Sequence, residues 1–293
     1  MGDPRLVVEQ VGALALVQDL GRPGHGSLGV PVSGAADRRA LRLANRLVGN
    51  CEGAAAIEVL LGGLALRATV ASTVAVTGAP APFTVDGRPA ALYAPVQVAA
   101  GQTLALGRPA HGLRSYVAVR GGLQTERSLG SASTDLTSGL GPPPLQAGHD
   151  LRVGTSSVDV VRHSELAATH GTRHGDLVLR AILGPRDDWF AEEAVRLLGT
   201  TAWEVTHDSN RVGVRLSGPS LARTRAGELA SEGVVRGAVQ VPASGQPLVF
   251  FADHPTTGGY PVVAVVVDED TDLLAQARPG DRVRFELRRA TWL

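Results

Sequence analysis

Helical periodicity is confined to a few short segments of the chain. The clearest is 35–48, in which the apolar positions Ala40, Leu41, Ala44, Leu47 and Val48 fall on one helical face. Ser33 is placed to cap the N-terminus of this predicted helix, Asp37 lies in its first turn, and Gly49 follows as a C′ residue. Two further helices are expected at 187–198 and 272–276.

Most of the remaining chain alternates between short apolar runs and turn residues, which is typical of β-barrels and β-sandwiches. Strands are expected at 13–17, 56–61, 64–68, 73–77, 83–85, 103–106, 115–119, 177–182, 203–206, 213–216, 237–241, 248–252, 262–267 and 282–287. The dipeptide Asp86-Gly87 predicts a hairpin turn. We therefore expect a mainly β fold with a few helices, in two β-barrel domains at residues 1–165 and 176–293.

Charge and cysteine content narrow the function classes. The 293-residue chain carries 28 basic and 28 acidic side chains, so its balance gives no reason to expect nucleic acid or an anionic membrane as partner. Every basic residue is an arginine, which excludes a Schiff-base lysine, a Walker-A lysine and a lysine carrying covalent biotin or lipoyl. The single cysteine, Cys51, excludes internal disulfides and a cysteine-rich zinc site.

The chain also lacks an apolar run long enough to span a membrane, and its N-terminus lacks the apolar core of a signal peptide. A cytoplasmic protein is therefore expected.

Three loop segments stand out. The glycine- and proline-rich stretch 17–34 contains GHGSLG, but Pro31 follows where a dinucleotide-binding fingerprint needs a helix, so a binding loop or a plain surface loop is favoured. The stretch 121–150 predicts a long functional loop. The stretch 155–175 predicts a linker, and the glycines beside His170 and His174 argue against a metal-binding helix there.

Long motifs resemble one known family. They are VQDLGRPGHGSLGVPVSGAADRRALRLANRLVGNCEGAAAIEVLLGG at 17–63, LGPRDDWF at 183–190, SNRVGVRLSG at 209–218 and SEGVVRGAVQVPASGQPLVFFADHPTTGGYP at 231–261. The chain resembles the allophanate hydrolase subunit 2 family, also called the KipA family, over nearly its whole length. The resemblance implies β-barrel domains of the kind called cyclophilin-like.

The resemblance also implies partners and cofactors. Family members occur as a subunit of an ATP-dependent 5-oxoprolinase, which opens 5-oxoproline to glutamate, beside a KipI-like allophanate hydrolase subunit 1. From this resemblance we also expect a third, lactam-opening subunit and a small-molecule substrate. ATP with Mg²⁺ is expected to bind elsewhere in the assembly. Two alternatives stay open: a carboxyltransferase acting on urea or a similar amide with biotin from a separate carrier, and a regulatory protein that binds a KipI-like kinase inhibitor.

The matched polar positions supply the candidate site residues. The expected catalytic residues are Glu232, Asp253 and Asp19. The expected substrate- or anion-binding residues are Arg22, Ser33, Arg211, Gln240, Thr256, Thr257, Gly258, Gly259 and Tyr260, and no metal site is expected. Other matched polar positions are Asp37, Asn45, Glu58, Asp188, Ser209 and Asn210.

Each candidate residue fits either a role in the site or a purely structural role. Gly258 and Gly259 permit positive φ, so their N–H groups can form an anion-binding nest, although a plain turn between two strands fits the sequence equally well. Glu232 suits a buried general base or a solvated turn residue. Asp19 and Arg22 are spaced to pair across a turn.

Four positions depart from the family's usual pattern. His254 and Pro255 stand where arginine and glutamine are usual, and Val262 stands where lysine is usual. Cys51 replaces a usual proline, so we do not expect it to be catalytic. The missing lysine predicts that this member has altered or lost any chemistry that needs it.

Overall fold

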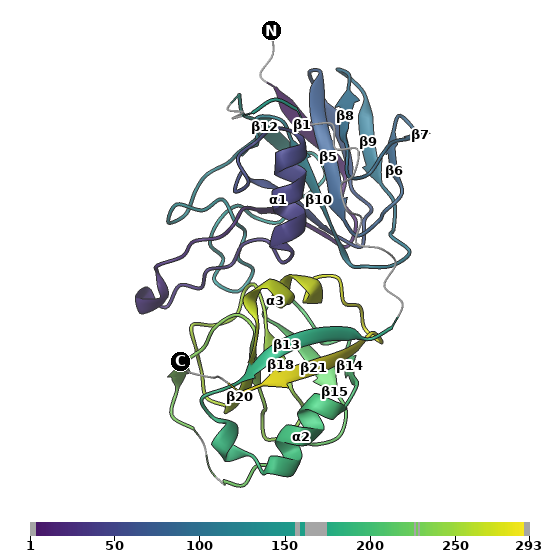
Figure 1. Ribbon diagram of the computed structural model, residues 1–293. Helices are drawn as coiled ribbons and strands as arrows, with labels where there is room; N and C mark the ends of the chain where they lie inside the picture. Colours follow the sequence, from purple (N-terminus) through teal and green to yellow (C-terminus); the bar gives the residue numbers. More distant parts are fainter. Residues whose placement is uncertain (1–3, 156–158, 162–174, 226, 228, 290–293) are drawn as a thin grey trace. The chain divides into compact units, whose positions relative to one another are not determined.

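The computed structural model describes residues 4–155, 159–161, 175–225, 227 and 229–289, and over these residues the chain is mainly β, as predicted (Figure 1). The chain divides into two compact units: unit 1 comprises residues 1–22 and 33–173, and unit 2 comprises residues 23–32 and 174–293. Of the helices in the described residues, none is long and apolar enough to cross a membrane. The predicted linker at 155–175 lies largely outside the described residues, and so do His170 and His174.

Unit 1 is built from two antiparallel sheets around one apolar core. The seven-stranded sheet has the order β11-β12-β1-β4-β9-β6-β7, and the five-stranded sheet has the order β2-β3-β10-β5-β8. Their bounds are β1 Arg5–Gln10, β2 Leu14–Gln18, β3 Ala56–Leu60, β4 Ala65–Ala68, β5 Ser72–Gly78, β6 Phe83–Val85, β7 Arg88–Pro89, β8 Pro95–Val98, β9 Thr103–Leu106, β10 Arg114–Val119, β11 Leu123–Gln124 and β12 Asp150–Val153. Alternate side chains from both sheets fill the core, so unit 1 is a two-sheet structure.

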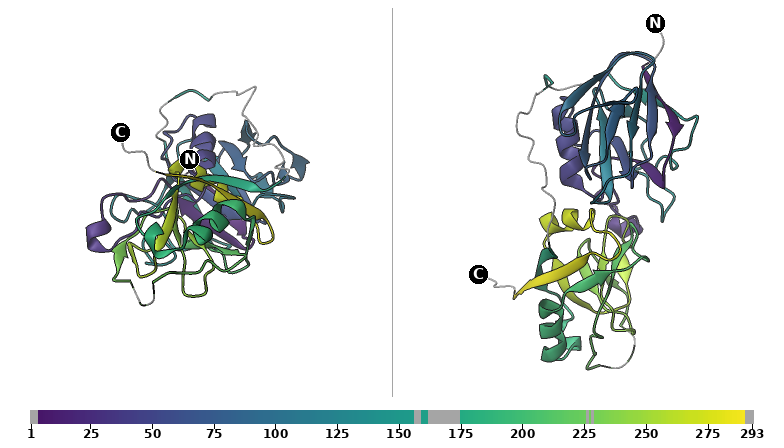
Figure 2. Two further views of the ribbon diagram at one scale, coloured as in Figure 1. Left: turned by 60° about the horizontal axis from the view of Figure 1, so that its bottom comes forward. Right: turned by 90° about the vertical axis from the view of Figure 1, so that its right-hand side faces the viewer.

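One helix covers a face of the five-stranded sheet in unit 1. Helix α1, Arg38–Leu47, packs its apolar side against β5 and β10 (Figures 1 and 2). Its N-cap is Asp37, whose carboxylate accepts a hydrogen bond from the Ala40 N–H, so the prediction that Ser33 caps the helix is wrong. Gly49 follows the helix with φ of 74°, as a C′ glycine should.

Unit 2 contains a closed barrel with the strand order β13-β20-β17-β18-β15-β14-β21. The bounds in this unit are β13 Leu177–Leu183, β14 Trp203–Val205, β15 Gly213–Ser217, β17 Ala238–Gln240, β18 Leu248–Phe250, β20 Val262–Val266, β21 Arg282–Arg288, α2 Glu192–Thr200 and α3 Asp268–Leu274. A separate two-stranded sheet pairs β16, Glu232–Gly233, with β19, Thr257–Gly258. The barrel has no free edge, and this small sheet carries several of the predicted site residues.

Candidate functional site

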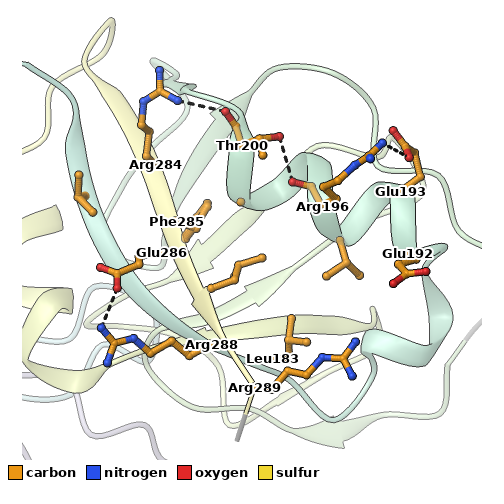
Figure 3. Close-up of a pocket in the computed structure, with 14 residues that line it drawn as sticks. Leu183, Glu192, Glu193, Arg196, Thr200, Arg284, Phe285, Glu286, Arg288 and Arg289 are labelled. Atoms are coloured by element: carbon orange, nitrogen blue, oxygen red, sulfur yellow. Dashed lines mark hydrogen bonds and ion pairs between the residues drawn. The ribbon is translucent and has the colours of Figure 1, made fainter.

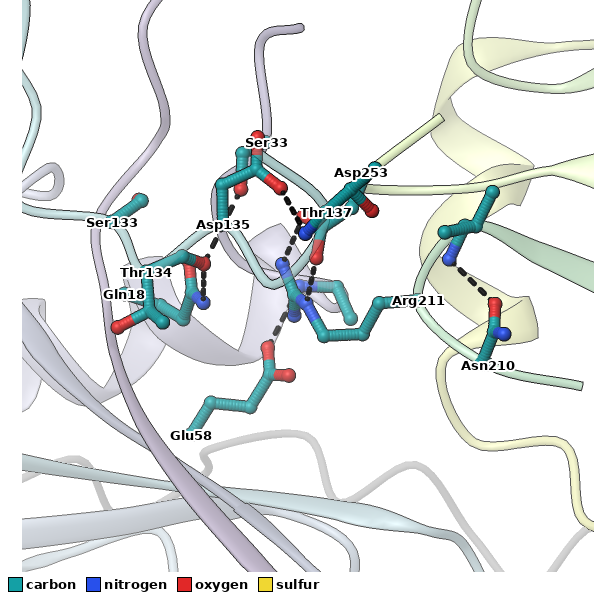
Figure 4. Close-up of polar contacts among 12 residues, drawn as sticks. Gln18, Ser33, Glu58, Ser133, Thr134, Asp135, Thr137, Asn210, Arg211 and Asp253 are labelled. Atoms are coloured by element: carbon teal, nitrogen blue, oxygen red, sulfur yellow. Dashed lines mark hydrogen bonds and ion pairs between the residues drawn. The ribbon is translucent and has the colours of Figure 1, made fainter. Parts of the chain in front are cut away.

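The predicted site residues fall into two sets, one in each unit. Asp19, Arg22 and Ser33 belong to unit 1, and the others belong to unit 2. Figure 4 labels Ser33 of the first set, and Arg211 and Asp253 of the second; it also draws Gln18 with its hydrogen bond to Thr134. Each set is a small network of buried polar side chains.

Asp19 anchors a loop in unit 1. Its buried carboxylate, directly after β2, accepts four hydrogen bonds from residues of two loops. The donors are the Gly21 N–H at 2.8 Å, the Ser131 hydroxyl at 2.6 Å, the Ser133 hydroxyl at 2.6 Å and the Ala132 N–H at 2.8 Å. A carboxylate engaged by this many donors has little capacity left to accept a substrate proton. Asp19 therefore holds the two loops together, and we assign it a positioning role.

Arg22 does not pair with Asp19, so the predicted ion pair across the turn is wrong. Its guanidinium is 1% exposed and donates from Nε to the Ser128 carbonyl at 3.3 Å and from Nη2 to the Ser133 carbonyl. Ser33 lies nearby in the network: its backbone has φ of 55°, and its hydroxyl donates to the Thr134 carbonyl at 3.4 Å. Backbone carbonyls of residues 128–134 therefore hold both Arg22 and Ser33.

The segment SASTD, residues 131–135, was not among the predicted site residues, yet it contacts every predicted residue of unit 1. Its hydroxyls reach Asp19, and its carbonyls accept from Gln18, Arg22 and Ser33. The signal in the sequence was its run of small hydroxyl residues inside a long loop with little regular structure. Spacing along the chain gives no hint of these contacts, because about 110 residues separate the partners.

A second polar centre in unit 1 lies under the N-terminus of α1. Glu58, 3% exposed, accepts hydrogen bonds from the Tyr116 hydroxyl at 2.6 Å and the Ala36 N–H at 2.9 Å. The Arg114 guanidinium lies 3.5 Å from its other oxygen. Burial, followed by the nearby Glu58 carboxylate, raises the pKa of Tyr116 well above its ordinary value, so this phenol stays a donor. Glu58 thereby helps to position the helix start.

Arg211 and Asp253 form a buried ion pair in unit 2. The guanidinium donates from Nε at 2.7 Å and from Nη2 at 2.9 Å, one bond to each carboxylate oxygen (Figure 4). The two side chains are 4% and 0% exposed. The Asp253 N–H also donates to the Arg211 carbonyl at 2.8 Å, so backbone and side chains fix the same pair. Two parallel hydrogen bonds of this kind fix the relative orientation of the two side chains.

Glu232 is held by an arginine that the site prediction did not include. Arg186, from the LGPRDDWF motif, donates to both Glu232 oxygens, the Nε bond measuring 3.0 Å. Both side chains are about one-third exposed, so Glu232 is not the buried base considered from the sequence. The hydrogen bond from Arg186 lowers the pKa of Glu232, whereas a general base working near neutral pH needs a raised one. The arrangement favours a structural or ligand-orienting role.

The TTGGYP segment does not form the glycine nest considered from the sequence. Neither Gly258 nor Gly259 has positive φ, and Gly258 lies in β19 opposite Glu232. Gln240, 2% exposed, instead donates to the Tyr260 carbonyl at 2.9 Å and lies directly beneath Gly258. The glycine is needed because a side chain would strike Gln240.

Two threonines and a tyrosine complete this segment. Thr256 is half-buried and its carbonyl accepts from the Val234 N–H at 3.0 Å, whereas Thr257 is exposed. Tyr260 is 47% exposed, and the Arg223 guanidinium lies 5.8 Å from its ring centroid. Tyr260 and Arg223 therefore form a cation–π contact at the surface of unit 2.

The positions that depart from the family pattern are apolar or neutral in character. Val262 is 7% exposed and belongs to a hydrophobic cluster with Val234, Ala238 and Phe250. His254 is also 7% exposed, its Nδ1 lies 2.7 Å from the Pro255 carbonyl oxygen, and burial is the largest cause of its lowered pKa. A lysine or arginine at either position would place a further charge in a buried environment.

A groove of about 950 Å³ lies beside α2 and β21, but none of the predicted site residues lines it (Figure 3). Two ion pairs lie among its lining residues, with Arg196 paired to Glu193 and Arg288 paired to Glu286 at 2.7 Å. Within the described part of the chain, no three histidine, cysteine or carboxylate side chains come together as metal ligands would.

Known proteins resemble this chain over nearly its full length. The family model "Carboxyltransferase domain, subdomain A and B" matches residues 28–287. A 5-oxoprolinase subunit of Escherichia coli is 38% identical over 283 residues, which cover 96% of this chain and 90% of that protein. The urea amidolyase of Saccharomyces cerevisiae is 32% identical over 303 residues, covering 94% of this chain but 16% of that protein.

Among solved structures, the urea amidolyase of K. lactis matches with a TM-score of 0.93 and 28% identity, covering 97% of this chain and 19% of that chain. The family match, the full-length relative and the structural match agree with the resemblance seen in the sequence motifs. The chain therefore belongs to the carboxyltransferase domain family, subdomains A and B.

Proposed function

We propose that this chain is a non-autonomous subunit of a 5-oxoprolinase-type, ATP-dependent amidohydrolase that works with a KipI-like subunit 1. The observation that carries the proposal is the match to the 5-oxoprolinase subunit of Escherichia coli, which extends over 96% of this chain and 90% of that protein. Urea amidolyase, in contrast, contains a region like this chain as one part among others. This similarity supports a role like that of the named subunit.

The side chains support a role in holding a substrate rather than in attacking it. Asp19 and Asp253 are engaged by buried donors, and Glu232 is paired with Arg186. Ordered networks of this kind position a polar ligand and exclude water. We therefore propose that a partner subunit supplies the nucleophile or general base for lactam opening.

We propose that ATP and Mg²⁺ bind to a partner subunit rather than to this chain. The sequence has no lysine for a phosphate-binding loop, and the described residues hold no cluster of three metal-ligating side chains. These two features support a nucleotide site on a partner subunit.

A second candidate is a carboxyltransferase subunit that acts on urea or a similar small amide. The carboxyltransferase family model and the structural match to urea amidolyase favour it. Because the chain has no lysine to carry biotin, a separate carrier would have to bring the carboxyl group. Both candidates act on a small amide, so the substrate distinguishes them.

Metabolite profiling of a deletion strain tests the proposal. Loss of the gene should raise cellular 5-oxoproline and leave urea unchanged, and re-expression of the chain should restore the normal level. Accumulation of urea without 5-oxoproline would favour the second candidate, and an unchanged profile of both would contradict the proposed function.

A further inference from the structure

Two polar atoms in the unit 1 network are buried and have no hydrogen-bond partner. They are the amide oxygen Oε1 of Gln18 and the guanidinium nitrogen Nη1 of Arg22. Gln18 is 0% exposed and Arg22 is 1% exposed, so bulk water does not reach either atom. Buried polar groups in folded proteins are paired almost without exception, and leaving one unpaired is strongly unfavourable. An unpaired acceptor together with an unpaired donor indicates a missing binding partner.

The orientation of both side chains is fixed by their other bonds. Gln18 donates from Nε2 to the Thr134 carbonyl at 2.8 Å, and a flipped amide would set two oxygens against each other. Arg22 is held through Nε and Nη2 by the carbonyls of Ser128 and Ser133. Since Ser133 and Thr134 are consecutive, their Cα atoms are about 3.8 Å apart, and the two side chains are anchored in one neighbourhood.

The chemistry of the missing partner follows from this pair. It must offer an N–H to Gln18 Oε1 and an oxygen to Arg22 Nη1. A carboxylate or phosphate offers acceptors only, so it would leave the Gln18 oxygen facing another oxygen. A cis amide or a urea offers a donor and an acceptor on the same edge of one small group.

We propose that Gln18 and Arg22 form a binding site for the amide group of a small lactam or urea, with the ligand N–H on Gln18 and its carbonyl on Arg22. That this amide is the substrate rests on the function proposed above; the site itself rests on the two unpaired atoms. The role of Arg22 then changes from general anion binding to recognition and polarisation of a neutral carbonyl.

The site is closed in this structure, so a ligand enters only when its walls move. The carbonyls that hold Arg22 and Gln18 lie within residues 128–134, in the stretch between β11 and β12. That stretch has little regular secondary structure of its own. Closure after entry would remove water from the amide, which strengthens both hydrogen bonds.

Ligand selectivity of the full chain tests the proposal without any mutation. Binding of 2-pyrrolidinone, N-methyl-2-pyrrolidinone, urea and acetate is measured by ligand-observed NMR and isothermal titration calorimetry. We expect 2-pyrrolidinone and urea to bind and the N-methyl compound to bind at least about tenfold more weakly, because it cannot donate to Gln18. Acetate should not displace 2-pyrrolidinone.

Variants locate the binding. Gln18→Leu and Arg22→Met should each weaken 2-pyrrolidinone binding about tenfold or more, whereas Gln146→Leu, on an exposed glutamine of the same unit, should leave it unchanged. In the complex with the partner subunits, Gln18→Leu should raise KM for 5-oxoproline. If a variant fails to fold, the comparison between 2-pyrrolidinone and its N-methyl derivative on the unaltered chain decides.

Three results would overturn the proposal and leave an internal water as the missing partner. They are equal binding of the N-methyl compound, full binding of 2-pyrrolidinone by folded Gln18→Leu, and no amide binding by the chain or its complex. The proposed function is judged separately. Turnover of 5-oxoproline with an unchanged KM in Gln18→Leu would retain the function and reject this site. Selective lactam binding without 5-oxoproline turnover would retain the site and reject the function.

Discussion

Replacing Gly258 with alanine tests whether the TTGGYP segment is fixed by close packing. An added Cβ at Gly258 would lie 2.4 Å from Nε2 of Gln240, well inside van der Waals contact. Gln240 is 2% exposed, and its Nε2 donates to the Tyr260 carbonyl at 2.9 Å. Relief of the clash therefore breaks this bond and leaves buried polar groups unpaired, which costs about 1–3 kcal/mol. Gly259→Ala is the matched control, because its Cβ meets nothing closer than the Leu229 carbonyl oxygen at 3.7 Å.

Urea denaturation followed by tryptophan fluorescence measures this difference. All three tryptophans lie within residues 174–293, so the signal reports on unit 2. We expect Gly258→Ala to lower the free energy of unfolding by about 1–3 kcal/mol, and Gly259→Ala to change it by less than about 0.5 kcal/mol. Because neither glycine has positive φ, backbone strain does not contribute to either value.

A double-mutant cycle shows whether Gln240 is the cause. In a Gln240→Ala background the added methyl group has room, so Gly258→Ala should then cost less than about 0.5 kcal/mol. Equal stability of the two glycine variants, or an undiminished cost in the Gln240→Ala background, would refute the packing argument.

Three further predictions concern the buried charges and the absent lysine. Asp253→Asn deprives the buried Arg211 of a carboxylate and should lower the unfolding free energy of unit 2 by about 3–5 kcal/mol, measured by the same fluorescence assay; a cost below about 1 kcal/mol would contradict it. Burial lowers the pKa of His254 from its ordinary 6.5, so the unfolded chain takes up this proton first, and unit 2 should lose stability as pH falls below about 6.5 toward the lower folded pKa; His254→Gln should lose less over the same range, and parallel curves would refute this. Intact-mass measurement of protein from its native host should show no covalently attached biotin or lipoyl, and an adduct of either mass would show that attachment does not need lysine.

Local patterns predicted much of the fold. The apolar stripe and the following glycine predicted a helix at 35–48, and the structure has one at Arg38–Leu47. Asp86-Gly87 predicted a hairpin turn, and these residues connect β6 to β7 with φ of 48° and 74°. The predicted start of α1 was wrong because two residues could cap it. Asp37 rather than Ser33 is the N-cap, since its carboxylate accepts a hydrogen bond from the N3 amide of Ala40. The predicted helix at 187–198 begins with a 3₁₀ turn, and regular α-helix starts only at Glu192.

The candidate site was less predictable because its contacts are long-range. Motif resemblance identified Asp19, Arg22 and Arg211, but nothing local indicated that Asp19 would bind hydroxyls about 110 residues away. The sequence suggests positive φ at Gly258, whereas the structure shows that the Gln240 side chain leaves no room for a Cβ there. That constraint depends on how distant strands are paired, which the sequence pattern does not specify.

We propose that this chain completes a 5-oxoprolinase without being active alone. This claim is tested most directly by measuring 5-oxoproline-dependent ATP hydrolysis and glutamate formation by the purified chain, by its co-expressed KipI-like and lactam-opening partners, and by the reconstituted set. We predict that the purified chain is inactive, that the set is active, and that omission of this chain abolishes glutamate formation. Turnover by the chain alone, or an undiminished rate without it, would contradict the account.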